Sequence, residues 1–177
     1  RFRSMQRNKI IRKKIVSIGT INNFKPYQFS VIDTIFELSG KGYSFEYHIY
    51  GEGPLKEELL TYIKTKKLQN RVFIHGWLSY DRFSEPLADA FVFIGMGTAL
   101  LEAAACGVPS MIAIESNIKP TTYGYVHHRT SFNIGEVERD DPGYSIGDQL
   151  EWLYKLDADA YQMECIKSKY WVENNFS

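Results

Sequence analysis

Short apolar runs rich in β-branched residues alternate with helix-like segments along most of this chain. Strand-like runs occupy residues 14–19, 45–50, 71–75, 90–94 and 110–114. Segments with apolar residues at helical spacing, which predict helices, lie at residues 27–39, 54–67, 79–87, 99–106, 145–156 and 158–175. Near-continuous apolar strands in serial alternation with helices are typical of a parallel sheet covered on both faces. The sequence therefore predicts an α/β fold with a doubly wound, Rossmann-like parallel sheet.

Residues 115–143 are less regular and richer in polar and turn residues than the rest of the chain. A sixth strand is predicted within this stretch, at residues 131–134. Doubly wound sheets bind their ligands outside the carboxyl ends of the strands. Functional residues are therefore sought in the loops that follow Gly19, Tyr50, His75, Ile94 and Ile114.

The chain has 177 residues, which suits a single domain with one core. No apolar run approaches the roughly 20 residues that a membrane-spanning helix needs. The two cysteines, Cys106 and Cys165, do not make a disulfide framework. A reducing, cytoplasmic location is therefore expected.

Positive charge is concentrated at the amino end of the chain. The first fourteen residues carry seven basic side chains and no acid, at Arg1, Arg3, Arg7, Lys9, Arg12, Lys13 and Lys14. We interpret residues 1–13 as a basic linker that runs into the first strand of a domain at residues 14–177. Such an arm can also touch phosphates or an anionic membrane surface, such as the inner face of the membrane. The remaining body is acidic, which argues against a nucleic acid partner.

A glycine-containing loop, Gly95-Met96-Gly97-Thr98, lies between a predicted strand and a predicted helix. Glycines let a backbone approach a ligand closely, and the first turn of a helix presents free N–H groups with positive partial charge. The loop therefore suits a diphosphate. A tight turn with Thr98 as the helix N-cap explains the same residues.

Two charged side chains stand close to this predicted edge of the sheet. Glu102 is the only polar residue of the segment 99–106, and its carboxylate can accept hydrogen bonds from the vicinal hydroxyls of a sugar. Lys25 lies in the loop after the first strand, where its ammonium group can reach a phosphate. The alternative is that both side chains simply face solvent.

Three segments resemble the donor domain of two-domain (GT-B) retaining glycosyltransferases of the family-4 type, the glycosyl transferases group 1. They are Tyr50-Gly-Glu-Gly-Pro-Leu-Lys-Glu-Glu-Leu-Leu60, Arg71-Val-Phe-Ile-His-Gly-Trp77 and Leu101-Glu-Ala-Ala-Ala-Cys-Gly-Val-Pro109. The likeness covers nearly the whole chain in the same order and spacing. It implies a C-terminal, donor-binding domain whose N-terminal acceptor domain is a separate part of the enzyme.

The resemblance assigns roles to particular residues. Lys25 is similar to the loop lysine that neutralises the donor diphosphate, which makes it the candidate for stabilising charge in catalysis. Glu102 is similar to the glutamate that holds the nucleotide ribose. The resemblance places the remaining candidate donor contacts at Gly19, Thr20, His75, Gly76, Gly95, Gly97, Thr98 and Ala99.

Two positions depart from the family pattern. The family often has a glutamate eight residues before Glu102, near the transferred sugar, and Ile94 stands there in this chain. The loop before the helix is also short. The family tends to carry a basic residue after the glycine of the first strand, where this chain has Thr20. Neutralisation of the diphosphate is therefore expected to rest on Lys25 and the helix N-terminus.

The expected reaction is transfer of a sugar from a nucleoside-diphosphate sugar to a hydroxyl acceptor, in polysaccharide or glycolipid biosynthesis. No cofactor is expected, and this domain alone is expected to turn over nothing. The alternatives are a sugar-nucleotide epimerase on the same scaffold and a nucleotide-binding module without catalysis. An NAD domain is disfavoured because the first strand lacks a Gly-x-Gly-x-x-Gly fingerprint.

The adjacent histidines His127 and His128 are the one pair that suggests a metal. Neighbouring residues in a strand or turn are expected to point apart, and the sequence offers no evident third ligand. The sequence therefore predicts no metal site.

Overall fold

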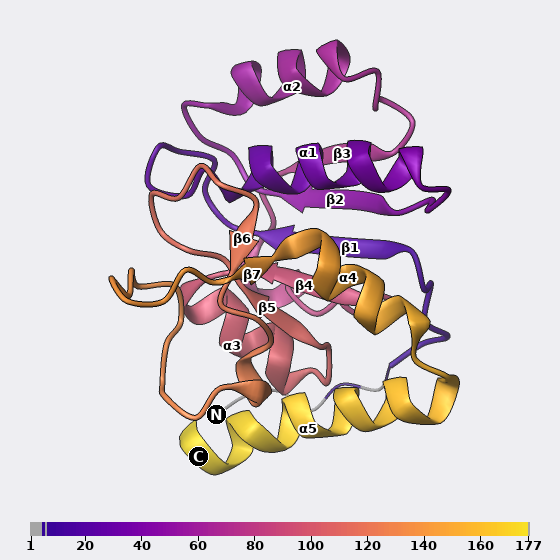
Figure 1. Cartoon of the computed structure of the whole chain (residues 1–177), viewed down its shortest axis with the longest axis vertical. Coiled ribbons are helices and arrows are strands. Elements are labelled where there is room, and N and C mark those ends of the chain that lie inside the picture. The colour runs from indigo at the N-terminus through magenta and orange to yellow at the C-terminus, as the bar shows by residue number, and fades with distance from the viewer. Residues whose placement is uncertain (1–4, 6, 177) are drawn as a thin grey trace.

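Five parallel strands form the central sheet of the computed structural model, which describes residue 5 and residues 7–176. The sheet order is β3-β2-β1-β4-β5 (Figure 1). The strands are β1 (Lys14–Ile18), β2 (Glu46–Tyr50), β3 (Val72–Gly76), β4 (Val92–Gly95) and β5 (Ser110–Ile112). The predicted doubly wound, Rossmann-like sheet is confirmed.

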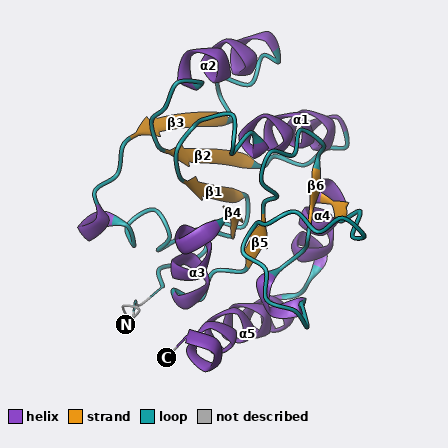
Figure 2. Cartoon of the chain, turned by 90° about the vertical axis from the view of Figure 1, so that its left-hand side faces the viewer, coloured by secondary structure: helices purple, strands orange, loops and turns teal. Residues whose placement is uncertain are grey.

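Helices cover the two faces of the sheet in two groups (Figure 2). One group packs with α1 and consists of α1 (Tyr27–Gly40), α2 (Lys56–Thr65) and α4 (Ile146–Lys155). The other group is the packed pair α3 (Gly97–Ala105) and α5 (Ala158–Phe176). All these bounds, including those of α3, agree with the predicted helices to within two residues.

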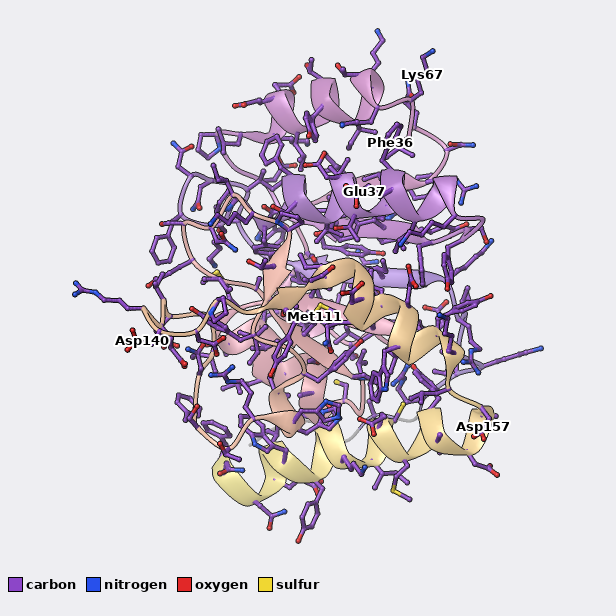
Figure 3. The ribbon with its side chains drawn as sticks, viewed as in Figure 1. Phe36, Glu37, Lys67, Met111, Asp140 and Asp157 are labelled. Carbon is purple, nitrogen blue, oxygen red and sulfur yellow. The ribbon has the colours of Figure 1, made fainter. Side chains whose placement is uncertain are left out.

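Neighbouring strand residues enter different cores because side chains alternate across a strand. Ile15 packs with the cluster that includes α1, α2 and α4, whereas Val16 packs with the cluster that includes α3. The same alternation holds for Met111 and Ile112 in β5. Met111 lies in the interior, behind α4 in the view of Figure 3. Burial on both faces explains why the strands are apolar throughout.

Two predicted elements are wrong. Residues 79–87 form a three-residue 3₁₀-helix (Tyr80–Arg82) followed by turns, because Pro86 lacks an N–H and disfavours helix at the residue before it. Residues 131–134 form no strand. Asn133 instead accepts a hydrogen bond from the amide of Gly135, and the only other sheet of the described residues pairs β6 (Thr121–Thr122) with β7 (Tyr144–Ser145).

The irregular stretch is held in place by charge and polar contacts. Arg129 forms ion pairs with Glu138 at 2.8 Å and with Asp141 at 3.0 Å, which hold the two ends of the loop at residues 129–141 together. Asp140 lies exposed at the edge of the molecule, at the outer end of this loop (Figure 3). A loop fixed in this way keeps one conformation without belonging to the sheet.

The described part of the basic segment packs on the domain. The guanidinium group of Arg7 donates to the carbonyls of Ala90 and Gly107. Arg12 donates to the carbonyls of Tyr154 and Leu156 at 2.9 and 2.7 Å. These two arginines are therefore engaged by their own chain, while Arg1 and Arg3 lie outside the described residues.

The loops after β1 and β2 approach each other closely at the carboxyl edge of the sheet. The amide of Ile21 donates to the carbonyl of Glu52, and the amide of Leu55 donates to the carbonyl of Ile21. A Cβ atom on Gly51 would lie 1.9 Å from the carbonyl oxygen of Gly19, and one on Gly53 would lie 2.2 Å from that of Ile21. Only glycine, which has no Cβ atom, lets the two backbones come this close at these two positions.

We expect Gly51→Ala to lower the free energy of unfolding by about 1–3 kcal/mol, because the added methyl group overlaps the backbone of Gly19. Denaturant unfolding followed by circular dichroism measures this change. Gly40→Ala is the matched control, since an added Cβ there meets nothing within 4 Å. The control should be neutral or more stable by up to about 1 kcal/mol, and equal stability of both variants would contradict the close approach.

Candidate functional site

The order of the strands reverses between β1 and β4, which are neighbours at the centre of the sheet. The chain leaves β1 towards α1 on one face and leaves β4 towards α3 on the other (Figure 2). The two loops therefore diverge from each other at the carboxyl ends of β1 and β4. Doubly wound sheets bind their ligands at this point. We call the loops at residues 19–26 and 95–98 the switch-point edge.

The loop after β1 is a fixed turn that carries Lys25. The side-chain oxygen of Asn22 accepts hydrogen bonds from the amides of Phe24 and Lys25, at 3.1 and 3.0 Å. Lys25 folds back over the start of the loop, since its Nζ would lie 4.0 Å from a Cβ atom on Gly19. Thr20 is exposed on the same loop. Among the described residues, no hydrogen bond or ion pair engages the ammonium group of Lys25.

The loop after β4 consists of one residue, Met96, between the end of the strand at Gly95 and the start of α3 at Gly97. Met96 is the N-cap and its side chain makes no capping hydrogen bond, so the alternative that Thr98 caps the helix is wrong. Ile94 is fully buried inside β4. The structure thus confirms the short loop and places residue 94 in the core, where an unpaired carboxylate would be costly to bury.

The amides at the start of α3 differ in their availability. Gly97 has a φ of 65°, and its N–H donates to the carbonyl of Ile134 at 2.7 Å. Thr98 is exposed and Ala99 is half-buried. The N–H groups in the first turn of a helix have no intrahelical partner. Thr98 and Ala99 therefore offer the amides that can bind an anion, and the amide of Gly97 is already occupied by its own chain.

Glu102 lies one turn into α3, on the same face as Thr98 because residues four apart share a face of a helix. Its side chain is half-buried, and no described residue pairs with its carboxylate. Lys25 and Glu102 are thus two uncommitted charges of opposite sign on the two sides of the switch-point edge. One suits a phosphate and the other suits sugar hydroxyl groups.

His75 and Gly76 are placed differently from each other. The ring of His75 stacks on Tyr50, with 4.5 Å between ring centroids, and its Nε2 lies 2.8 Å from Nδ1 of His48. His75 also lines a cavity of about 430 Å³ with Trp77 and Arg82. Gly76 lies at the loop edge, where its carbonyl accepts from the amide of Gly51 at 2.7 Å. The side chain of His75 therefore belongs to a cavity on the face of the sheet.

Sequence reasoning missed one buried polar group beside the switch-point edge. Gln28 lies in the first turn of α1, is 1% exposed, and donates to the carbonyl of Thr20 at 3.5 Å. Its Oε1 is buried without a partner among the described residues. A glutamine one residue into a helix carries no sequence signal that separates it from a solvent-exposed one.

The prediction that His127 and His128 point apart is wrong. The Nε2 atoms of both rings lie against the same carboxylate oxygen of Glu164, at 2.6 and 2.7 Å. The backbone turns at a 3₁₀-helix (Val126–His128), which brings consecutive side chains towards α5. The third residue lies 36 positions away in the sequence, so the spacing of the chain gave no signal for it.

The order of the sheet and the helices on its two faces place the chain in the doubly wound class of α/β domains. The chain belongs to the family described as glycosyl transferases group 1, whose sequence profile matches residues 3–121. Among the described residues, no helix is both long and apolar enough to cross a membrane.

Individual relatives agree with this membership. The chain is 28% identical over 176 residues to WcaL of Escherichia coli (strain K12), a protein named for a glycosyltransferase role in colanic acid biosynthesis. That match covers 93% of this chain and 41% of WcaL, so the chain spans less than half the length of this relative.

Solved structures share the fold. A variant of S. aureus TarM, in complex with Fondaparinux, α-GlcNAc-glycerol and UDP, has a TM-score of 0.74 at 19% identity over 100% of this chain and 35% of TarM. The C-terminal domain of the group 1 protein LpcC from Francisella tularensis has a TM-score of 0.67 at 18% identity, over 96% of this chain and 88% of that domain. The chain therefore has the fold of the C-terminal half of a GT-B enzyme.

His48 and His75, whose rings contact each other on one face of the sheet, make the stability of the domain depend on pH. Burial lowers the pKa of both His48 and His75, although the hydrogen bond to Glu46 works in the opposite direction for His48. The folded state therefore binds fewer protons than the unfolded chain near the unfolded histidine pKa of about 6.5, and stability is lost as the pH falls through that value.

We expect the free energy of unfolding to fall on acidification from about pH 7.5 to about pH 5.5. The fall should be smaller in the variant His48→Gln/His75→Gln, which lacks both titrating rings. Denaturant unfolding at each pH measures the difference. An equal fall in the two proteins would show that these rings titrate alike in the folded and unfolded states.

Proposed function

We propose that this chain is the donor-binding domain of a sugar-nucleotide glycosyltransferase, with the nucleoside diphosphate bound at the switch-point edge. The observation that carries the proposal is the arrangement of two uncommitted charged side chains, Lys25 and Glu102, on either side of the start of α3. Membership of the glycosyl transferases group 1 family supports the same assignment.

In this proposal each group has one electrostatic task. The diphosphate lies against the amides of Thr98 and Ala99, where the helix presents positive partial charge. Lys25 adds a full positive charge that stabilises the departing diphosphate as the bond to the sugar breaks. Glu102 accepts hydrogen bonds from the ribose hydroxyl groups. Lysine and helix amides supply the charge that other sites take from a metal, so the reaction needs no metal at this edge.

The remaining parts of the reaction belong to a longer protein. The chain spans 41% of WcaL, and the acceptor site is proposed to lie in a second, N-terminal domain. The name of WcaL, a glycosyltransferase of colanic acid biosynthesis, supports a role in polysaccharide assembly. A hydroxyl acceptor and a location on the cytoplasmic side of the membrane are part of the same proposal. The missing carboxylate at Ile94 leaves the contact to the transferred sugar to other groups.

A calorimetric titration of the chain with UDP, GDP, ADP and NAD tests the binding site. We expect saturable binding of one nucleoside diphosphate and no binding of NAD. Lys25→Ala and Glu102→Ala should each weaken binding about 10- to 100-fold, because a hydrogen bond to a charged group contributes roughly 1.5–3 kcal/mol.

Lys64→Ala and Glu57→Ala are matched controls, since both side chains are exposed on α2. Each removes the same type of charge as a test variant and should leave binding unchanged. If each control acts like the test variant that removes the same charge, the nucleotide is held by net charge and not by the switch-point edge.

Product analysis on the longer protein that carries this domain separates the enzyme classes. A sugar attached to a hydroxyl acceptor is the predicted product. Release of an epimerised sugar from the nucleotide would instead identify an epimerase on the same scaffold. Nucleotide binding without turnover of any donor would identify a binding module, for which the buried Ile94 is the structural reason.

A further inference from the structure

Three metal-ligating side chains meet on the face of the domain that carries α5. His127 and His128 come from the 3₁₀-helix after β5, and Glu164 comes from the middle of α5. Their ligand atoms all lie within 4.8 Å of one another. No other part of the described chain brings three such groups so close together. His48 contacts His75 through Nδ1 and Glu46 through Nε2, so the other two groups lie on opposite sides of the His48 ring.

The cluster contains a buried negative charge. The side chain of Glu164 is 8% exposed and that of His127 is 1% exposed. Burial works against ionisation of Glu164, but the hydrogen bonds from His127 and His128 hold its pKa below the usual value. Lys167 lies 3.3 Å from the second carboxylate oxygen, and its own side chain is 55% exposed. Because the lysine is exposed to solvent, it compensates the buried charge of Glu164 only in part. A cation bound beside the carboxylate would stabilise that charge.

The two imidazoles are also suited to a cation. The side chain of His127 is almost completely buried, which favours the neutral ring and leaves one ring nitrogen with a lone pair for a ligand. Metal ions bind the neutral imidazole. Two imidazole nitrogens and one carboxylate oxygen form a ligand set that zinc takes in proteins, at about 2.0–2.2 Å from each atom.

We propose that His127, His128 and Glu164 form a binding site for a divalent transition-metal ion of the zinc class, separate from the switch-point edge. His128 is the exposed member and lines a cavity of about 280 Å³ with Tyr125, Arg129 and Tyr144. This cavity gives the ion a path from solvent and leaves one side of its coordination sphere open to water. The ion joins the segment after β5 to α5 and thereby stabilises the packing of the last helix.

A network of hydrogen bonds without a metal is the rival explanation. In that network both Nε2 atoms carry a proton and donate to Glu164. The Nδ1 of His127 is buried without a partner among the described residues, and it stays so with or without a metal. The two explanations therefore differ in one measurable property, the affinity of the cluster for a metal ion.

Calorimetry of the chelator-treated chain with zinc chloride, paired with the visible absorption of cobalt(II), tests the proposal. We expect one metal ion per chain and a rise of the melting temperature of roughly 5–10 °C when free zinc exceeds its Kd about 100-fold. Glu164→Gln keeps the size of the side chain and removes its charge. This variant should weaken binding by more than the roughly 10- to 100-fold that loss of a supporting contact costs.

The four histidines of the chain provide a matched control. His127→Gln/His128→Gln should abolish binding, whereas His48→Gln/His75→Gln should bind zinc as the wild type does. His128→Gln alone changes a side chain that is 39% exposed, so it keeps the test valid if the double variant does not fold. The proposal is overturned if the wild-type chain binds no zinc, or if replacing His128 leaves affinity and stoichiometry unchanged.

Discussion

The parallel pairing of β1 with β4 is the contact on which the rest of the structure depends. Ile15 lies opposite Val92 and Val16 opposite Phe93, and all four side chains are fully buried. The hydroxyl of Ser17 adds a hydrogen bond to the carbonyl of Ile94 across the same pair of strands. Because the connections of these strands go to opposite faces, this pairing creates the one place where two loops diverge around an open edge. The pairing of β1 with β4 therefore fixes the positions of Lys25 and of the start of α3.

Gly51 and Gly53, in the loop after β2, have a structural role that requires no ligand. The segment Gly51-Glu52-Gly53 resembles a family motif, and the structure explains both of its glycines by the approach of the loop after β1. The same contact fixes the start of the loop that carries Lys25. Residues that help to position a site can therefore carry the family pattern without any contact to a ligand.

Repetitive local patterns predicted most of the fold. The apolar strands and the amphipathic helices were located to within about two residues, because burial on one or both faces leaves a period in the sequence. The predicted helix at residues 79–87 failed at Pro86, and the predicted strand at residues 131–134 failed because Asn133 and Gly135 form a turn. In both segments, residues that favour turns determine the backbone conformation despite the apolar residues beside them.

The candidate site was predictable only in part. Lys25, Thr98, Ala99 and Glu102 lie around the predicted edge because strand order fixes where the loops end. The sequence could not show that Ile134 occupies the amide of Gly97, nor that His127 and His128 converge on Glu164. Each of these depends on a contact between segments that lie more than thirty residues apart, for which a single sequence has no periodic signal.

Amide NMR of the chain during titration with the preferred nucleoside diphosphate shows where on the domain the nucleotide binds. We expect the largest shifts at the amides of Thr98 and Ala99, and a smaller response at Gly97 because Ile134 occupies its amide. Largest shifts at His48, Tyr50 and His75, on the face of the sheet, would contradict it and place the nucleotide in the cavity beside Trp77.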